Sequence, residues 1–176
     1  MPRPFLLAFF LTGTLLAPVG IAAETSSRND GLPYEIANAT IHGTEYGPVT
    51  LQDGVWEGEP WVEDGAARPR VGLASNFLLM GDVDSDGLDE AVVIVWQSSG
   101  GSGTYNYVAL MDNDNGTMKN TAITALGDRV KVIEGAVSPG RVELQVIEHD
   151  EDDPACCPTR HATRYYNDKL EPIEAP

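Results

Sequence analysis

A ten-residue acidic segment, Gly81 to Glu90, constrains this chain more than any other part of its sequence. It reads Gly-Asp-Val-Asp-Ser-Asp-Gly-Leu-Asp-Glu, with carboxylates at loop positions 1, 3, 5 and 9 and a glycine at position 6. Ca²⁺ prefers several oxygen ligands around a sharp turn, and this spacing supplies them. Without an ion, so many carboxylates in one turn would repel one another. The expected ligands are the side chains of Asp82, Asp84, Asp86 and Glu90 and the main-chain carbonyl of Leu88.

The sequence around this loop predicts two flanking β-strands rather than the two helices of an EF-hand. An EF-hand takes its last carboxylate from loop position 12, which is Val93 in this chain. Val93 lies within 91–96, an apolar and mostly β-branched run that is typical of a buried strand. The segment 77–80 before the loop is also short and apolar. We therefore expect the loop to connect two strands and to take its last carboxylate from Glu90.

An Asp-x-Asp-x-Asp-Gly-x-x-Glu loop that runs into a β-strand resembles the calcium loops of FG-GAP and VCBS-type repeats, the integrin-like class. Those families repeat the loop from blade to blade. This chain has one convincing copy, at 82–90, which argues against a complete propeller.

A second resemblance covers about residues 33–170. The motifs that carry it, besides the calcium loop, are Asp-Gly-x-x-Glu-Gly-Glu-Pro at 53–60, Ser-Ser-Gly-Gly-Ser-Gly-Thr at 98–104, Leu-Gly-Asp-Arg-Val at 126–130 and Asp-Pro-x-Cys-Cys-Pro-Thr at 153–159. In this order they resemble an exported bacterial domain found alone or ahead of META-type domains in envelope proteins. That family has no assigned reaction, so the resemblance implies a compartment and a calcium loop but no chemistry.

The first 23 residues have the features of a secretory signal peptide. Arg3 provides a short positive segment, residues 5–16 are apolar, and small residues precede a cleavage site after Ala23. The apolar run is too short for a membrane span, and no second run follows. We therefore expect a periplasmic or secreted protein with a flexible tail at 24–32 and one calcium-binding domain at 33–176.

The charge of the chain limits its partners. The formal net charge is −16 at pH 7, which excludes binding to nucleic acid or anionic lipid through bulk electrostatics. Such a chain attracts divalent cations and basic partners instead. The sequence identifies neither the partner, an unknown protein or glycan, nor the oligomeric state.

The remaining sequence predicts a mainly β fold. Short apolar runs alternate with turn signals, and no segment shows sustained helical periodicity. Hairpins are expected at Asn115-Gly116, at 138–140 and around 52–54. We expect a single domain of antiparallel hairpins, either propeller-blade-like or a sandwich. The predicted strands are 49–51, 55–57, 77–80, 91–96, 105–111, 117–126, 130–133, 142–147 and 160–166.

Cys156 and Cys157 are the only cysteines, and they are adjacent. Two thiols in an exported protein usually form a disulfide, although neighbouring Cα atoms lie about 3.8 Å apart, closer than in most disulfides. The expected bond closes a tight ring and holds a turn without catalysing a reaction. Free or intermolecular thiols are alternatives. A soft-metal site with His149 and His161 is another, but adjacent cysteines chelate poorly.

Three functional hypotheses follow. The first is a non-enzymatic, calcium-stabilised envelope or secreted β-domain that binds a ligand or protein. The second is a hydrolase or carbohydrate-active enzyme that uses the acidic loop from Trp56 to Asp64. The third is a metal or redox protein that uses Cys156 and Cys157. Catalysis has little support, since there is no Gly-x-Ser-x-Gly motif, and the Gly-rich segment 98–103 lacks the Lys and helix of a phosphate-binding loop.

Overall fold

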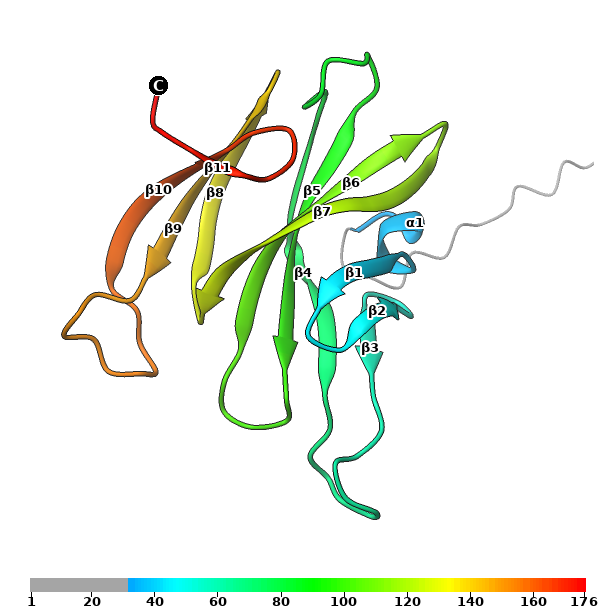
Figure 1. The fold of residues 1–176 in the computed structure, drawn as a ribbon, viewed down its shortest axis with the longest axis vertical. Coiled ribbons are helices and arrows are strands. Elements are labelled where there is room, and N and C mark those ends of the chain that lie inside the picture. The colour runs from blue at the N-terminus through cyan, green and yellow to red at the C-terminus, as the bar shows by residue number, and fades with distance from the viewer. Residues whose placement is uncertain (1–31) are drawn as a thin grey trace, which may run out of the picture.

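The structure, a computed structural model, describes residues 32–176. These residues form antiparallel β-strands and one single-turn helix, so the predicted mainly β fold is confirmed (Figure 1). The elements are α1 (Tyr34–Ala37), β1 (Thr40–Thr44), β2 (Gly47–Thr50), β3 (Val55–Glu57), β4 (Arg70–Gly81), β5 (Glu90–Ser98), β6 (Tyr105–Asp114), β7 (Thr117–Asp128), β8 (Lys131–Ser138), β9 (Arg141–Glu148), β10 (Arg160–Tyr166) and β11 (Pro172–Ile173).

The described strands are arranged in three sheets. A five-stranded sheet has the order β3-β4-β5-β6-β7, a four-stranded sheet has the order β11-β10-β9-β8, and β1 pairs with β2. In Figure 1 the four-stranded sheet lies on the left, beside the five-stranded sheet in the centre. Both larger sheets are built from consecutive strands, the arrangement that successive hairpins produce.

The five-stranded sheet is buried on both faces, and β5 shows this most clearly. Ala91, Val93 and Val95 enter one core together with side chains of α1, β1 and β2. Val92 and Ile94 enter a second core, which is completed by side chains of β9 and β10 from the four-stranded sheet. Alternate side chains of a strand point to opposite faces. Burial of both faces therefore explains why 91–96 is continuously apolar rather than alternating.

Two predicted hairpins and the predicted strand over 160–166 are confirmed. Asn115 and Gly116 join β6 to β7 with φ of 52° and 92°, and a two-residue type I′ turn needs positive φ at both positions. Gly140 precedes β9 in the turn after β8 and has a φ of 72°. The last predicted strand is β10, which pairs with β9 along its whole length.

The hairpin predicted over 49–57 is wrong. Its turn forms, because an isolated bridge joins Gln52 to Val55. Beyond that bridge the strands separate, since β2 pairs with β1 and β3 pairs with β4. The amide of Leu51 donates to the carbonyl of Ala39 at 3.0 Å, which extends the contact with the β1 side, and the Leu51 side chain is buried in the first core.

The predicted boundary of the tail also needs a correction. Leu32, assigned to the tail from sequence, is 4% exposed and packs in the first core with Ile36. The rest of the predicted tail and the predicted signal peptide lie outside the described residues. Among residues 32–176 there is no helix with the length and hydrophobicity needed to cross a membrane.

Candidate metal centre

The acidic loop joins β4 to β5, as the sequence predicted. Gly81 and Glu90 form the last pair of this antiparallel ladder, so the loop leaves and re-enters neighbouring strands. Ser85 and Gly87 have φ of 69° and 92°. A Cβ on Gly87 would meet no atom within 4 Å. Glycine is therefore favoured there by backbone conformation and not by lack of space.

Three of the predicted ligand side chains converge. Asp82, Asp84 and Asp86 each offer a carboxylate oxygen, and these oxygens lie within 4.8 Å of one another. Backbone amides of the loop hold the carboxylates in place. Asp82 accepts from the amides of Ser85 (2.7 Å) and Gly87 (3.1 Å), and Asp84 accepts from the amide of Asp86 (3.1 Å). These bonds fold the loop around its own acidic side chains.

Glu90, the fourth predicted carboxylate, is buried. It is 1% exposed, and its Oε2 accepts hydrogen bonds from the amides of Val83 (2.7 Å) and Asp84 (3.4 Å). Its Oε1 has no hydrogen-bond partner among residues 32–176. Burial raises the pKa of Glu90, the two amides oppose this effect, and the charges of Asp84 and Asp86 raise the pKa further. A buried carboxylate with one unsatisfied oxygen is costly unless a cation lies against it.

These residues fit a hard divalent cation. The donor set consists of carboxylate oxygens, with neither sulfur nor imidazole, and this chemistry suits Ca²⁺ better than Zn²⁺ or Cu²⁺. The amide of Leu88 donates to the Asp86 carboxylate at 2.8 Å. This bond ties Leu88, whose carbonyl is a predicted ligand, to one of the converging aspartates. The structure brings three of the four predicted carboxylates together, and Glu90 is not part of the group whose oxygens lie within 4.8 Å of one another.

Val83 links this loop to the other sheet, a role that the sequence analysis missed. Its side chain is fully buried in the second core, and its carbonyl accepts a hydrogen bond from the amide of Gly140 at 2.6 Å. Gly140 belongs to the turn between β8 and β9. The available signal was an apolar residue between two aspartates in an otherwise polar loop. Such a residue must bury its side chain against something outside the loop.

The acidic loop from Trp56 to Asp64 has a different organisation. The Glu57 carboxylate pairs with Arg68 (2.9 Å) and Arg70 (3.2 Å). Trp61 is 56% exposed, and its indole N–H donates to the carbonyl of Ser99 at 2.6 Å. Glu57 is thus held as the ion-pair partner of two arginines.

A surface groove of about 440 Å³ lies between β7 and the β10–β11 region. Its lining includes Thr124, Arg164, Tyr166 and Ile173. The Arg164 guanidinium pairs with Glu148, and it also donates to the carbonyl of Leu126 at 2.8 Å. The groove combines apolar walls with a few polar groups and has the size of small-ligand sites.

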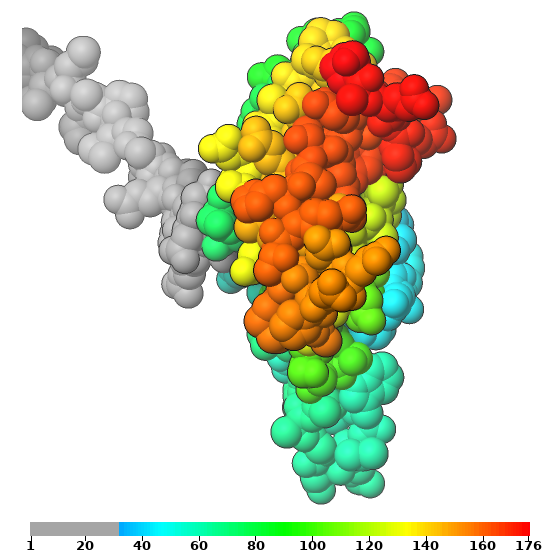
Figure 2. All heavy atoms as spheres, turned by 90° about the vertical axis from the view of Figure 1, so that its left-hand side faces the viewer, coloured from blue at the N-terminus to red at the C-terminus, as the bar shows by residue number. Residues whose placement is uncertain are grey.

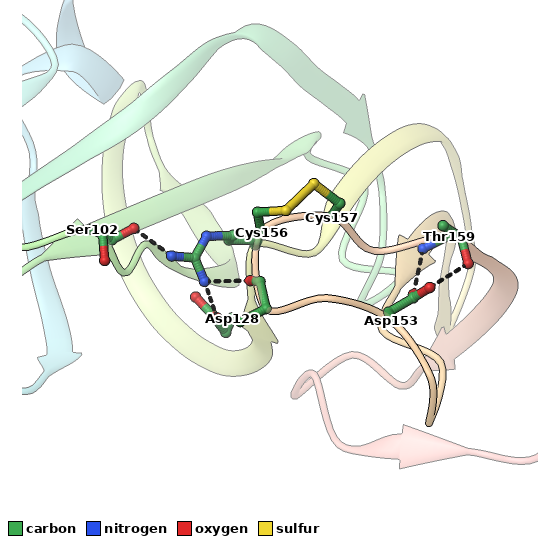
Figure 3. Close-up of a disulfide and its surroundings, with 8 residues drawn as sticks. Ser102, Asp128, Asp153, Cys156, Cys157 and Thr159 are labelled. Carbon is green, nitrogen blue, oxygen red and sulfur yellow. Dashed lines mark hydrogen bonds and ion pairs between the residues drawn. A yellow bond between two sulfur atoms is a disulfide. The ribbon is translucent and has the colours of Figure 1, made fainter.

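Cys156 and Cys157 form the predicted vicinal disulfide, with Cα atoms 3.7 Å apart (Figure 3). Both residues are exposed. Their sulfurs are bonded to each other, so in this state neither is a thiolate available to a metal. The alternative soft-metal site with His149 and His161 therefore has no sulfur ligand in this state.

Replacing both cysteines with Ser is expected to cost little stability. Loop-closure entropy for a ring of two residues amounts to only about 1 kcal/mol, against about 3 kcal/mol for a fifteen-residue loop. Urea unfolding under non-reducing conditions measures the difference, and the response to calcium should be unchanged. A loss of several kcal/mol would mean that the bond supports far more than its own turn.

A comparison with protein-family models, curated proteins and solved structures finds no match to this chain. The functional argument therefore rests on the residues and geometry described above.

Proposed function

We propose that this chain is a calcium-binding β-domain in which the ion is structural and which acts by binding a partner rather than by catalysis. The observation that carries the proposal is the buried Glu90 carboxylate, whose Oε1 has no partner among residues 32–176. Natural proteins rarely bury such a group without compensation. The converging carboxylates of Asp82, Asp84 and Asp86 lie in the same loop and offer the oxygen ligands that Ca²⁺ prefers, and we propose that Glu90 completes the set.

A structural role for the ion follows from its position. The loop ends are Gly81 and Glu90, in neighbouring strands, and Val83 fixes the loop to the second core. An ion there would hold together carboxylates that repel one another, in a loop that joins two strands and contacts the second sheet. Strand-to-strand placement with the last carboxylate at position 9 also supports kinship with FG-GAP and VCBS-type calcium loops, which we propose on this basis.

The partner is proposed to be a protein or a glycan. The 440 Å³ groove beside β10 and the half-exposed ring of Trp61 are the surface features that support ligand binding. The formal charge of −16 favours neutral or basic partners over polyanions.

The ion proposal is tested by thermal unfolding of wild type and two variants with excess chelator and with excess Ca²⁺. At a calcium concentration one hundred times Kd, binding stabilises the native state by about 2.7 kcal/mol. Wild type should therefore melt at a clearly lower temperature in chelator. Asp84→Ala should lose this difference.

Asp89→Ala is the matched control, because Asp89 lies in the same loop and is exposed but does not belong to the converging group. It should keep the calcium response. Identical melting curves of wild type in chelator and in calcium would remove the ion from the account.

The proposed compartment is the periplasm or the exterior of the cell. The exported protein should begin at Glu24 if residues 1–23 are removed as a signal peptide. N-terminal sequencing of protein recovered outside the cytoplasm checks this. Recovery of the chain with Met1 intact in the cytosol would contradict it.

A further inference from the structure

The loop that carries the disulfide is held together by bonds that do not involve sulfur. The Asp153 carboxylate accepts from the amide and the hydroxyl of Thr159, both at 2.7 Å (Figure 3). It also accepts from the amide of Asp150 at 2.8 Å. Within this frame, the amide of Cys157 donates to the carbonyl of Pro154 at 2.9 Å. The two ends of the loop are thus joined around the S–S bond by hydrogen bonds in which no sulfur atom takes part.

Arg129 anchors the same loop from the other side. Its guanidinium donates to the carbonyl of Ala155 at 2.7 Å and to the carbonyl of Ser102 at 2.5 Å, and it pairs with Asp128. Its own amide donates to Thr104 at 2.8 Å. A fixed cation therefore lies against the peptide that precedes Cys156.

Both cysteines are exposed, on a loop of the face that Figure 2 presents, where the orange part of the chain lies at the surface. Access is one requirement for attack on a disulfide, and exposed disulfides tend to be the labile ones. We propose that Cys156–Cys157 is a reversible thiol–disulfide exchange site, which an external dithiol reduces while the domain stays folded. This role is independent of calcium. Each disulfide that is reduced oxidises one molecule of the dithiol.

The exchange runs in two displacements. A thiolate of the dithiol attacks the Cys157 sulfur and forms a mixed disulfide, and Cys156 leaves as a thiolate that takes up a proton. The second thiolate of the reagent then displaces Cys157 and closes its own disulfide. Two electrons pass to the protein, which ends with two thiols, while the dithiol is oxidised.

The Arg129 guanidinium bears on which sulfur leaves first. It is bound to the carbonyl of Ala155, the residue before Cys156, and its positive charge favours a thiolate leaving from that side, so we assign the first departure to Cys156. The nearby anions are Asp128, whose pairing with Arg129 offsets part of the guanidinium charge, and Asp153, whose carboxylate accepts three hydrogen bonds. The other charged or titratable groups of this loop are His149 and the exposed side chains at 150–152.

The test uses the full exported chain with dithiothreitol at neutral pH, with thiol titration, intact mass and far-ultraviolet circular dichroism. We expect two thiols and the mass of two added hydrogen atoms, with an unchanged dichroism spectrum. Glutathione disulfide should then restore the original bond in a monomeric product. The double Cys→Ser variant, which cannot form the disulfide, provides the reference dichroism spectrum for the folded protein without that bond.

Thiols that appear only in denaturant, or reduction that abolishes the β spectrum, would overturn the proposal.

The role assigned to Arg129 is tested separately, by the rate at which dithiothreitol reduces the disulfide. Arg129→Gln should be reduced several-fold more slowly than wild type, and Arg129→Lys, which keeps the charge, should recover most of the rate. Arg68→Gln, a charge loss elsewhere on the surface, should match wild type. Equal rates in Arg129→Gln and wild type would remove Arg129 from the mechanism.

Discussion

With Glu90 replaced by Gln, the calcium-free protein is expected to be more stable than wild type and the calcium-saturated protein less stable. In the calcium-free state, the buried Glu90 carboxylate keeps one oxygen without a partner among residues 32–176. An unsatisfied buried group costs about 1–3 kcal/mol, and more when it is charged. Gln removes the charge, while its amide oxygen can still accept from the amide of Val83. Much of the cost should therefore disappear.

Calcium should invert this order, because a neutral amide is a weaker ligand than a carboxylate. Wild type gains about 2.7 kcal/mol at one hundred times Kd, and the variant should gain little. Urea unfolding of both proteins in chelator and in calcium measures the four free energies. Glu134→Gln, on an exposed residue of β8, should match wild type in both conditions. If Glu90→Gln lowers stability equally in both, Glu90 acts through packing alone.

The second large effect concerns the contact between the two sheets. Gly140 is exposed, so its amide should owe its protection from hydrogen exchange to the 2.6 Å bond to the Val83 carbonyl. The amide of Val83 in turn donates to Glu90 at 2.7 Å. An ion that fixes Glu90 and the loop should also fix the turn between β8 and β9.

Calcium at one hundred times Kd should slow exchange of the Gly140 amide by about a hundredfold, if opening of this bond releases the ion. Exchange measured by nuclear magnetic resonance with and without calcium gives the ratio. The Cys157 amide is the internal control, because it belongs to an exposed turn that can open without the calcium loop. Equal ratios at Gly140 and Cys157 would show that the loop and the hairpin are not coupled.

The sequence predicted most local features of the fold but not the partners of all its strands. Turn signals such as Asn115-Gly116 act between neighbouring residues, so they can be read directly. The failure at 49–57 has a different origin. The turn at Gln52 is correct, but β1 and β4 compete for the flanking strands. That competition depends on contacts far apart in the sequence.

The candidate metal site shows the same difference between local features, which the sequence predicts, and long-range contacts, which it does not. The spacing of Asp82, Asp84 and Asp86 was enough to predict that they converge, because a tight loop folds around its own residues. The burial of Glu90 and the contact of Val83 with Gly140 depend on how the second sheet packs, which a loop motif does not encode. The convergence of the three aspartates was thus predictable from the sequence, whereas the burial of Glu90 and the contact with the second sheet were not.

The most direct test of the calcium account is a calorimetric titration of the chelated, full exported chain with Ca²⁺. We predict saturable binding of one ion per chain, weaker binding of Mg²⁺, whose octahedral preference the crowded carboxylates suit less well, and loss of the calcium signal in Asp84→Ala but not in Asp89→Ala. Absence of binding at millimolar Ca²⁺, or equal binding by wild type and Asp84→Ala, would contradict the account.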